Sequence, residues 1–402
     1  MIQNTRPHSN DGSLREAGGQ VMKSLLAPAV ISGKPVESIS DIGGNSRPDR
    51  RPGPSAFEDT KEKPLQLLLL GDCMFGRLVN EVLENAPPEY PWGDTLPILH
   101  SADWRLCNLE CVISDRGMPW SASPKVFHFR SAAKNIAVLE AARINAVSLA
   151  NNHVLDYGYD AMFEMLGILD RAGIAHSGAG ANYAQASWLA TAEVSGRKIG
   201  LFAFTDNEPD WEAAADWPGV FYVPTDLKDS RAAKLLDIIR ERREAVDFLI
   251  VSAHWGSNWG YSPPQEHVVF AHALIDAGAD LVFGHSCHVF RGIEFYKGRP
   301  ILYSAGNFVD DYAVDRIERN DQSFIYLMDT EGRLSRGVRL YPTLIRRCRA
   351  SRAEGVHAVG ITDKMKELCK PFHTSASWNQ AQQCLEIGYS TRDYEKQMRA
   401  AR

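Results

Sequence analysis

The stretch "PLQLLLLGD", residues 64–72, opens the folded part of this 402-residue chain. Four consecutive leucines are typical of a strand buried on both faces, and the Gly-Asp pair after them ends that strand with a carboxylate. In layered α/β proteins, functional groups gather where the strands end. Asp72 is therefore a first candidate for a functional residue, although an aspartate at such a place more often caps a helix.

Three segments of the chain differ in composition. Residues 1–62 are rich in Ser, Gly, Pro, Asn and charge, as in "GGNSRPDRRPGPSAFEDTKE", and contain few aromatic residues. Such a segment cannot bury enough apolar surface to fold, so we predict a disordered leader over 1–62. Residues 63–350 carry the patterns of a folded domain. Residues 351–402 are polar and helix-prone, which predicts a helical C-terminal extension.

Downstream of residue 72, strand-like runs alternate with helix-like runs. Strands are predicted over 104–110, 145–153, 198–206, 248–255 and 280–288. Apolar positions that repeat every 3.6 residues predict helices over 131–144, 159–173, 226–245 and 263–279. Beyond residue 289 the pattern changes to paired β runs, with Lys297-Gly298 and Glu331-Gly332 at the expected turns. This order predicts a layered α/β domain with mixed sheets.

The bulk composition excludes several classes of protein. Hydrophobic residues make up 44% and charged residues 23%, and the net charge is −6 without a basic stripe, so we expect a soluble globular protein that binds no nucleic acid. No apolar run reaches the roughly 18–20 residues that a transmembrane helix needs. Seven cysteines without close spacing indicate reduced thiols and a cytoplasmic protein. Translation from Met22, "MKSLLAPAVISG", would favour export instead.

Polar side chains end five of the predicted strands. Carboxylate, amide and imidazole together suit Mn²⁺, Zn²⁺ or Fe²⁺, and two such ions would hold a phosphate ester and activate water. Each residue alone has a simpler explanation as a cap, a turn or a hydrogen-bonded polar group, but their coincidence at strand ends favours an active site. The candidate metal ligands are Asp72, Asn108, Glu110, Asn152, His254, His285 and His288, with His153, Asp72 and His254 as candidate catalytic groups.

Five motifs in order give the chain a family resemblance. "LGDCMFGR", "NLECVIS", "LANNHVLDYG", "HWG" and "GHSCHVFRGIEFYKGRPILYSAGNFV" resemble the CapA-type proteins of poly-γ-glutamate capsule synthesis, within the calcineurin-like metallophosphoesterase superfamily. The resemblance covers about residues 65–312 and implies a four-layer α/β/β/α sandwich with two mixed sheets. It also implies that Lys125 and Arg130 of "KVFHFR", together with Asn307, bind an anionic substrate; as an alternative, the two cations are ordinary surface charges on a loop.

The motifs depart from the wider superfamily at three places. Its first Asp-x-His is here Asp72-Cys73-Met74, its second Gly-Asp is "NLE", and its last Gly-His-x-His has become "GHSCH". We therefore expect one of two metal positions to be weak or empty, leaving a single ion or none. The four cysteines within the motifs are expected to be small buried residues rather than zinc ligands, since paired C-x₂-C spacing is absent; they are Cys73, Cys107, Cys111 and Cys287.

Three functions agree with these patterns. The first is a metal-dependent phosphoesterase-like hydrolase linked to capsule, poly-γ-glutamate or peptide tailoring, in which His153 protonates the leaving group. The second is a metal-independent peptide epimerase like those found with lasso peptides, where Asp72 and His153, His254 or His285 would exchange a Cα proton. The third is a non-catalytic component that binds an anionic polymer. An anionic small molecule, polyglutamate or a peptide is accordingly the expected substrate.

Overall fold

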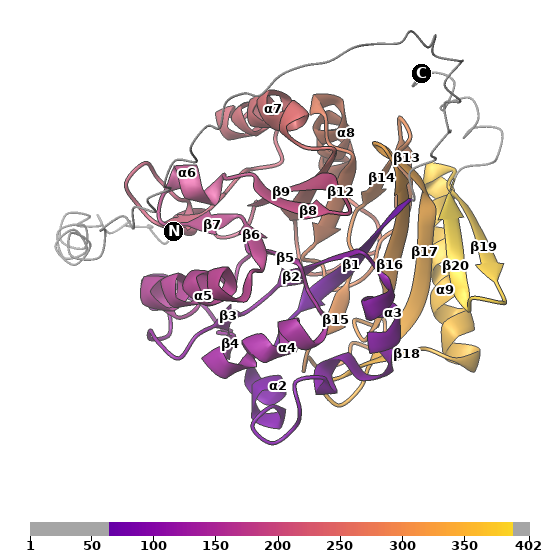
Figure 1. Ribbon diagram of the computed structural model, residues 1–402, viewed down its shortest axis with the longest axis horizontal. Helices are drawn as coiled ribbons and strands as arrows, with labels where there is room; N and C mark the ends of the chain where they lie inside the picture. Colours follow the sequence, from indigo (N-terminus) through magenta and orange to yellow (C-terminus); the bar gives the residue numbers. More distant parts are fainter. Residues whose placement is uncertain (1–63, 389–402) are drawn as a thin grey trace, which may run out of the picture. The chain divides into compact units, whose positions relative to one another are not determined.

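The computed structural model describes residues 64–388 (Figure 1). The predicted leader over 1–62 lies outside the described residues, so its prediction stays untested. Within 64–388, two large β-sheets and the helices on their outer faces form the folded domain.

The larger sheet is ten-stranded and mixed. The strands along its main path are β19 (Ser375–Asn379), β20 (Cys384–Gly388), β17 (Leu334–Ile345), β16 (Gln322–Glu331), β1 (Leu65–Cys73), β2 (Trp104–Leu109), β5 (Ala146–Ser148) and β6 (Ala175–Ser177). Strands β1, β2, β5 and β6 pair in parallel, whereas β16, β17, β20 and β19 add antiparallel partners. Two further strands pair with β1 and β17, namely β15 (Asn307–Val309) and β18 (Ala350–Arg352).

The second sheet has a parallel centre and antiparallel edges. Its order is β13 (Ile293–Tyr296), β14 (Arg299–Leu302), β12 (Leu281–His285), β11 (Phe248–His254), β9 (Arg197–Thr205) and β8 (Ala190–Val194). Two short pairs complete the strands, β3 (Val112–Ile113) with β4 (Arg130–Ser131) and β7 (Ala179–Gly180) with β10 (Gly219–Val220).

Helices cover the outer faces of both sheets (Figure 1). The helices that lie between strands of the larger sheet along the chain are α2 (Arg77–Val82), α3 (Leu96–Ser101), α4 (Ile136–Ala141) and α5 (Gly158–Ala172). Helices α7 (Ser230–Arg242) and α8 (Gln265–Ala277) pack on the outer face of the second sheet. Helix α9 (Gly355–Cys369) contributes to the core between the sheets, and α6 (Tyr183–Ala186) is a single short turn. The short 3₁₀ helices are η2 (Tyr90–Thr95), η3 (Ala133–Asn135), η4 (Pro209–Trp211), η5 (Arg243–Ala245) and η6 (Lys370–Phe372).

The leucine run of β1 shows why the layers form. Leu68 and Leu70 point outward and pack with Met165 of α5, whereas Leu67 and Leu69 point inward to the core shared with the second sheet. Each buried leucine contributes about 1.5–3 kcal/mol relative to an exposed one. Because both faces of β1 are buried, the strand carries no polar alternation.

The second sheet repeats this arrangement. On β11, Ile250 faces the shared core, while Leu249 and Val251 pack against the layer that contains Leu235 of α7 and Leu274 of α8. Three cores between four layers therefore confirm the predicted α/β/β/α sandwich with two mixed sheets.

The tail differs from its prediction. Its helix is present as α9, but residues 375–388 form the β19–β20 hairpin, which extends the larger sheet by pairing β20 with β17 (Figure 1). The stretch is mostly polar; Leu385 and Ile387 are buried in the shared core, and Ala376 and Trp378 pack against it. A purely helical extension over 351–402 was therefore the wrong prediction for residues 375–388; residues 389–402 lie outside the described part.

No helix within residues 64–388 combines the length and the apolar character that crossing a membrane would require. All seven cysteines of the sequence lie in this part of the chain, and none forms a disulfide.

Candidate metal centre and cleft

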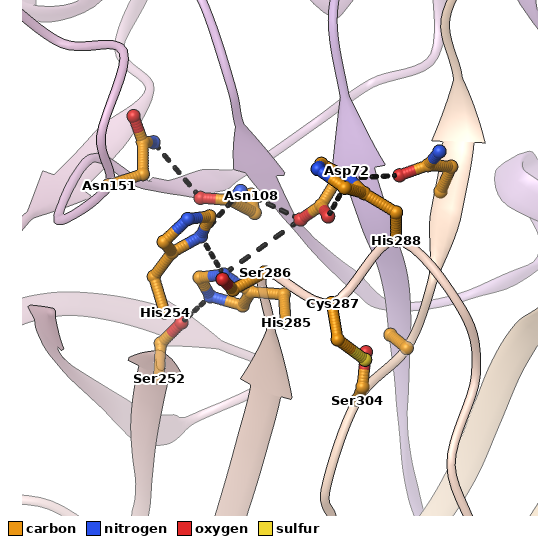
Figure 2. Close-up of polar contacts among 12 residues, drawn as sticks. Asp72, Asn108, Asn151, Ser252, His254, His285, Ser286, Cys287, His288 and Ser304 are labelled. Atoms are coloured by element: carbon orange, nitrogen blue, oxygen red, sulfur yellow. Dashed lines mark hydrogen bonds and ion pairs between the residues drawn. The ribbon is translucent and has the colours of Figure 1, made fainter. Parts of the chain in front are cut away.

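Strand register brings the candidate ligands together. Asp72 on β1 lies opposite Asn108 on β2, and His254 on β11 lies opposite His285 on β12. Parallel strands end at the same edge, and cross-strand partners share a face. The two pairs therefore meet between the sheets (Figure 2).

The first group of donor atoms contains one carboxylate and two imidazoles. Asp72, His254 and His285 each offer an atom within 4.8 Å of the others. The Nδ1 atoms of the two histidines are 2.8 Å apart, and His285 Nδ1 lies 3.9 Å from Asp72 Oδ1. All three side chains are at most 1% exposed. This nitrogen-rich set suits Zn²⁺, Fe²⁺ or Mn²⁺.

Burial keeps these imidazoles neutral. It lowers the pKa of His285 to about 3 and holds the pKa of His254 well below its ordinary value, with the neighbouring His285 acting in the same direction. The Nε2 atom of His285 lies 2.8 Å from Ser252 Oγ. Donation of an Nε2 proton to this hydroxyl leaves the Nδ1 lone pair directed at the cluster, as a metal-binding histidine requires.

The second group shares Asp72 with the first. Asp72, Glu110 and His288 have donor atoms within 4.8 Å of one another. After β12 the backbone turns sharply, with φ of 105° at Ser286 and 60° at His288. This turn brings His288 Nδ1 to 3.7 Å from Asp72 Oδ2, while Asn108 and His285 approach Oδ1. One carboxylate thus faces two positions through its two oxygens.

Unpartnered oxygens show that a cation fits here. Asp72 Oδ2 and both carboxylate oxygens of Glu110 are buried without a hydrogen-bond partner. Burial, with the nearby Asp72 charge, raises the pKa of Glu110 well above its ordinary value. Burial disfavours the charged form of His288, but Glu110 and Asp72 outweigh it and raise its pKa to about 10. Because unpaired buried carboxylates are costly, a divalent ion would satisfy the donor set.

The departures in the motifs therefore have a structural counterpart. Met74 offers no ligand; its sulfur accepts a hydrogen bond from the Gly76 N–H at 3.0 Å. The sequence predicted one weak or empty position, yet Glu110 and His288 supply donor atoms at the second one. Occupancy of either position stays a prediction.

Asn108 acts on the carboxylate rather than offering its oxygen. Its Nδ2 donates to Asp72 Oδ1 at 2.8 Å, while its Oδ1 accepts from Asn151 Nδ2 at 3.1 Å. Asn151 also donates to the Leu109 carbonyl at 2.8 Å. In this arrangement Asn108 positions Asp72, and its assignment as a ligand stays a prediction; Asn151 is a supporting residue that the sequence analysis missed.

Asn152 and His153 face the cleft beside the cluster. The Oδ1 of Asn152 is buried without a partner, which leaves it available as a ligand oxygen. His153 Nδ1 lies 2.6 Å from Asp156 Oδ2, and its ring stacks on Phe129 at 4.0 Å between centroids. Burial lowers the pKa of His153 and raises that of Asp156 to about 7. Burial thus disfavours the charged forms of both His153 and Asp156.

A cleft of about 480 Å³ leads from the surface to these groups. Its lining includes Arg77, Lys125, Val126, Phe127, Phe129, Asn152, His153, Glu208, Trp259, His288 and Tyr312. Of the predicted substrate-binding residues, only Lys125 is among the lining residues. Its ammonium group donates to the Asn152 carbonyl at 2.6 Å and to Glu208 Oε1 at 2.9 Å.

Arg130 and Asn307 lie in other surroundings. The Arg130 guanidinium stacks on the Tyr157 ring at 4.2 Å, and the residue does not line the cleft. Asn307 is fully buried on β15, where its Oδ1 lies 2.9 Å from His288 Nδ1. Direct substrate contacts by Arg130 and Asn307 stay a prediction; in the structure Asn307 bonds His288, and Arg77 is the cleft arginine that the sequence analysis missed.

The motif cysteines behave as small buried residues. Cys73, Cys107 and Cys111 belong to the core between the larger sheet and its helices, and Cys287 is also fully buried. Neither candidate cation position in residues 64–388 includes a cysteine. Asp156 and Phe129 were missed too, although Asp156 follows His153 by three residues in the quoted motif.

The sequence of this chain is similar to those of a known protein family. The family described as "Bacterial capsule synthesis protein PGA_cap" matches residues 66–312. A "Probable polyglutamine synthesis accessory protein" of Mycobacterium tuberculosis (strain CDC 1551 / Oshkosh) is 36% identical over 300 residues, which cover 70% of this chain and 77% of the relative.

Two Bacillus proteins are also similar. "Capsule biosynthesis protein CapA" of Bacillus anthracis is 27% identical over 253 residues, or 62% of this chain and 61% of that protein. "PGA biosynthesis protein CapA" of Bacillus subtilis (strain 168) is 29% identical over 249 residues, or 61% and 63%.

Proposed function

This chain belongs to the bacterial capsule synthesis family PGA_cap, and from that premise we propose that it is a metal-dependent phosphoesterase-like hydrolase acting in capsule, polyglutamate or peptide tailoring. One observation carries the proposal: two groups of donor atoms share Asp72, and Asp72 Oδ2 and both buried oxygens of Glu110 lack a hydrogen-bond partner. A purely structural cluster would have those oxygens hydrogen-bonded.

Different residues would bind the ions and orient the ligands. Divalent ions at the two positions would polarise a phosphoryl oxygen and lower the pKa of the attacking water. Asp72, His254 and His285 would hold one ion, and Asp72, Glu110 and His288 the other. Asn108 and Ser252 orient these ligands through hydrogen bonds of 2.8 Å to Asp72 and His285.

His153 supplies the proton for the leaving group. Asp156 holds its Nδ1 at 2.6 Å, which leaves Nε2 as the ring nitrogen available to the cleft. In the imidazolium form both ring nitrogens carry a proton; as water attacks phosphorus and the P–O ester bond breaks, the departing oxygen would take the Nε2 proton, and Nδ1–H stays bonded to Asp156. Burial lowers the pKa of His153, so this imidazolium gives up its proton readily.

The test is hydrolysis of p-nitrophenyl phosphate by the full chain, stripped with chelator and reloaded with Mn²⁺. We expect turnover only after reloading, and His254→Ala should abolish it. His100→Ala is a control, because that imidazole bonds the Ala141 carbonyl away from the cleft. Equal turnover with and without metal, or an active His254→Ala, would contradict the proposal.

A metal-independent peptide epimerase is the second candidate. The observation that favours it is that two imidazoles, His153 and His288, line one cleft and could act from different sides of a Cα atom. Deuterium uptake at a peptide Cα in the presence of chelator would support this function over hydrolysis. Uptake that needs added metal would count against it.

A further inference from the structure

The mouth of the cleft exposes large apolar side chains. Val126, Phe127 and Trp259 line the cleft and are 85%, 57% and 46% exposed. The fold gains little from apolar groups left in water, and such groups gathered at a cleft indicate a binding surface. Val126 and Phe127 are adjacent in the sequence and Trp259 lies far from them, so two separate segments build the apolar mouth.

Aromatic rings continue from this mouth to the two cleft histidines. On one side, the Phe127 and Phe129 centroids are 6.3 Å apart, and Phe129 stacks on His153 at 4.0 Å. On the other side, the Trp259 centroid is 6.2 Å from that of His288. Aromatic rings thus line the path from the surface to these histidines, alongside polar residues, and such rings suit a ring-bearing substituent.

The cations of the cleft are already paired with carboxylates. Lys125 Nζ lies 2.9 Å from Glu208 Oε1 and 3.5 Å from Asp156 Oδ1. Arg77 Nε lies 3.3 Å from Asp311 Oδ2. Among the described residues, these are the lysine and arginine side chains that line the cleft. A chain of carboxylates such as polyglutamate would need several cations not committed elsewhere.

We propose that the cleft is selective for an ester whose anionic reacting group carries an apolar, ring-bearing substituent, and that Phe127 and Trp259 hold this substituent. The inference rests on the proposed function, because the ion-binding groups receive the anionic end. A volume of about 480 Å³ accommodates such a small molecule. Phe127 and Trp259 thereby determine specificity without acting in the chemical step.

Non-hydrolysable phosphonates test this proposal by calorimetry on the Mn²⁺-loaded full chain. We expect benzylphosphonate to bind about tenfold more tightly than methylphosphonate. Replacing both rings, Phe127→Ser with Trp259→Ser, should remove that preference, so that benzylphosphonate binds no more tightly than methylphosphonate. Trp188→Ser is the matched control, because Trp188 is an exposed tryptophan that does not line the cleft.

The possible results distinguish a failure of the proposed substrate specificity from a failure of the proposed hydrolase function. Equal affinities for the two phosphonates, unchanged in the double variant, would overturn the specificity and leave the proposed function intact. Tighter binding of tri-γ-glutamate than of benzylphosphonate would also overturn it. If neither phosphonate binds the metal-loaded chain, the proposed function itself fails.

Discussion

The two ends of strand β12 hold buried carboxylates in opposite states. Asp280, just before the strand, accepts from the Leu249 N–H at 2.9 Å and pairs with Arg243, Arg299 and Arg333 at 2.9, 3.2 and 3.2 Å. Beyond the other end, where His288 follows the strand, the oxygens of Glu110 have no hydrogen-bond partner.

The contrast between Asp280 and Glu110 indicates a structural role for the first carboxylate and a functional role for the second. Asp280 is fully buried, and burial raises its pKa while the three guanidinium groups act against that rise. Its partners come from both sheets, since Arg299 is on β14 and Arg333 lies in the β16–β17 turn. The Asp280 cluster is complete within the protein. The Asp72–Glu110 cluster leaves three buried carboxylate oxygens without a hydrogen-bond partner, and this contrast is the physical basis of the metal proposal.

Loss of Asp280 should have the largest effect on stability. In Asp280→Ala, three arginines lose a buried partner, and we expect unfolding to become easier by about 3–5 kcal/mol. Denaturant unfolding measures this. Asp237→Ala is the control, because Asp237 pairs with Arg240 on the surface and its loss should cost at most about 1 kcal/mol. An equal loss of stability in Asp280→Ala and Asp237→Ala would contradict a structural role for Asp280.

Glu110→Gln, by contrast, should raise the free energy of unfolding of the metal-free protein. With its raised pKa, Glu110 takes up a proton on folding near neutral pH, so the stability falls as pH rises from the ordinary glutamate range through the folded-state pKa. Glutamine removes that cost, and we expect a gain of about 1–3 kcal/mol at pH 7. Exposed Glu241→Gln should change nothing. A destabilised Glu110→Gln would show that this carboxylate is structural.

Buried His267 should make a smaller contribution to the pH dependence of stability. Burial, with Arg291 nearby, lowers its pKa to about 4. The unfolded chain therefore binds the extra proton between about pH 6.5 and 4, so stability is lost as pH falls through that window. Between pH 7 and 5.5 we expect a loss of about 1 kcal/mol that His267→Phe, still stacked on Trp255, no longer shows. Identical pH profiles of unfolding would refute this.

Much of the fold could be predicted from local patterns. Continuous apolar runs such as β1 and β11 are buried on both faces, so the sequence alone indicated strands and layers. The β19–β20 hairpin could not be predicted, because it is an edge element with few apolar residues and is defined by pairing with β17.

The site was predicted in part for a related reason. Strand ends identified Asp72, His254 and His285, because register alone brings them together. Which neighbour of a pair points inward was beyond the sequence: Asn151, not Asn152, bonds Asn108. The approach of His288 depends on positive φ values after β12, and the apolar cleft mouth depends on an irregular segment that includes Phe127. Neither leaves a periodic signal.

Equilibrium dialysis of the full chain against Mn²⁺, read out by elemental analysis, tests the central claim most directly. Two groups of donor atoms predict about two bound ions per chain in the wild type, one in Glu110→Gln, and near-complete loss in Asp72→Asn, whose side chain serves both positions. Asp280→Asn, at the completed cluster, should retain both ions. No stoichiometric metal in the wild type, or equal binding by Asp72→Asn, would contradict the account.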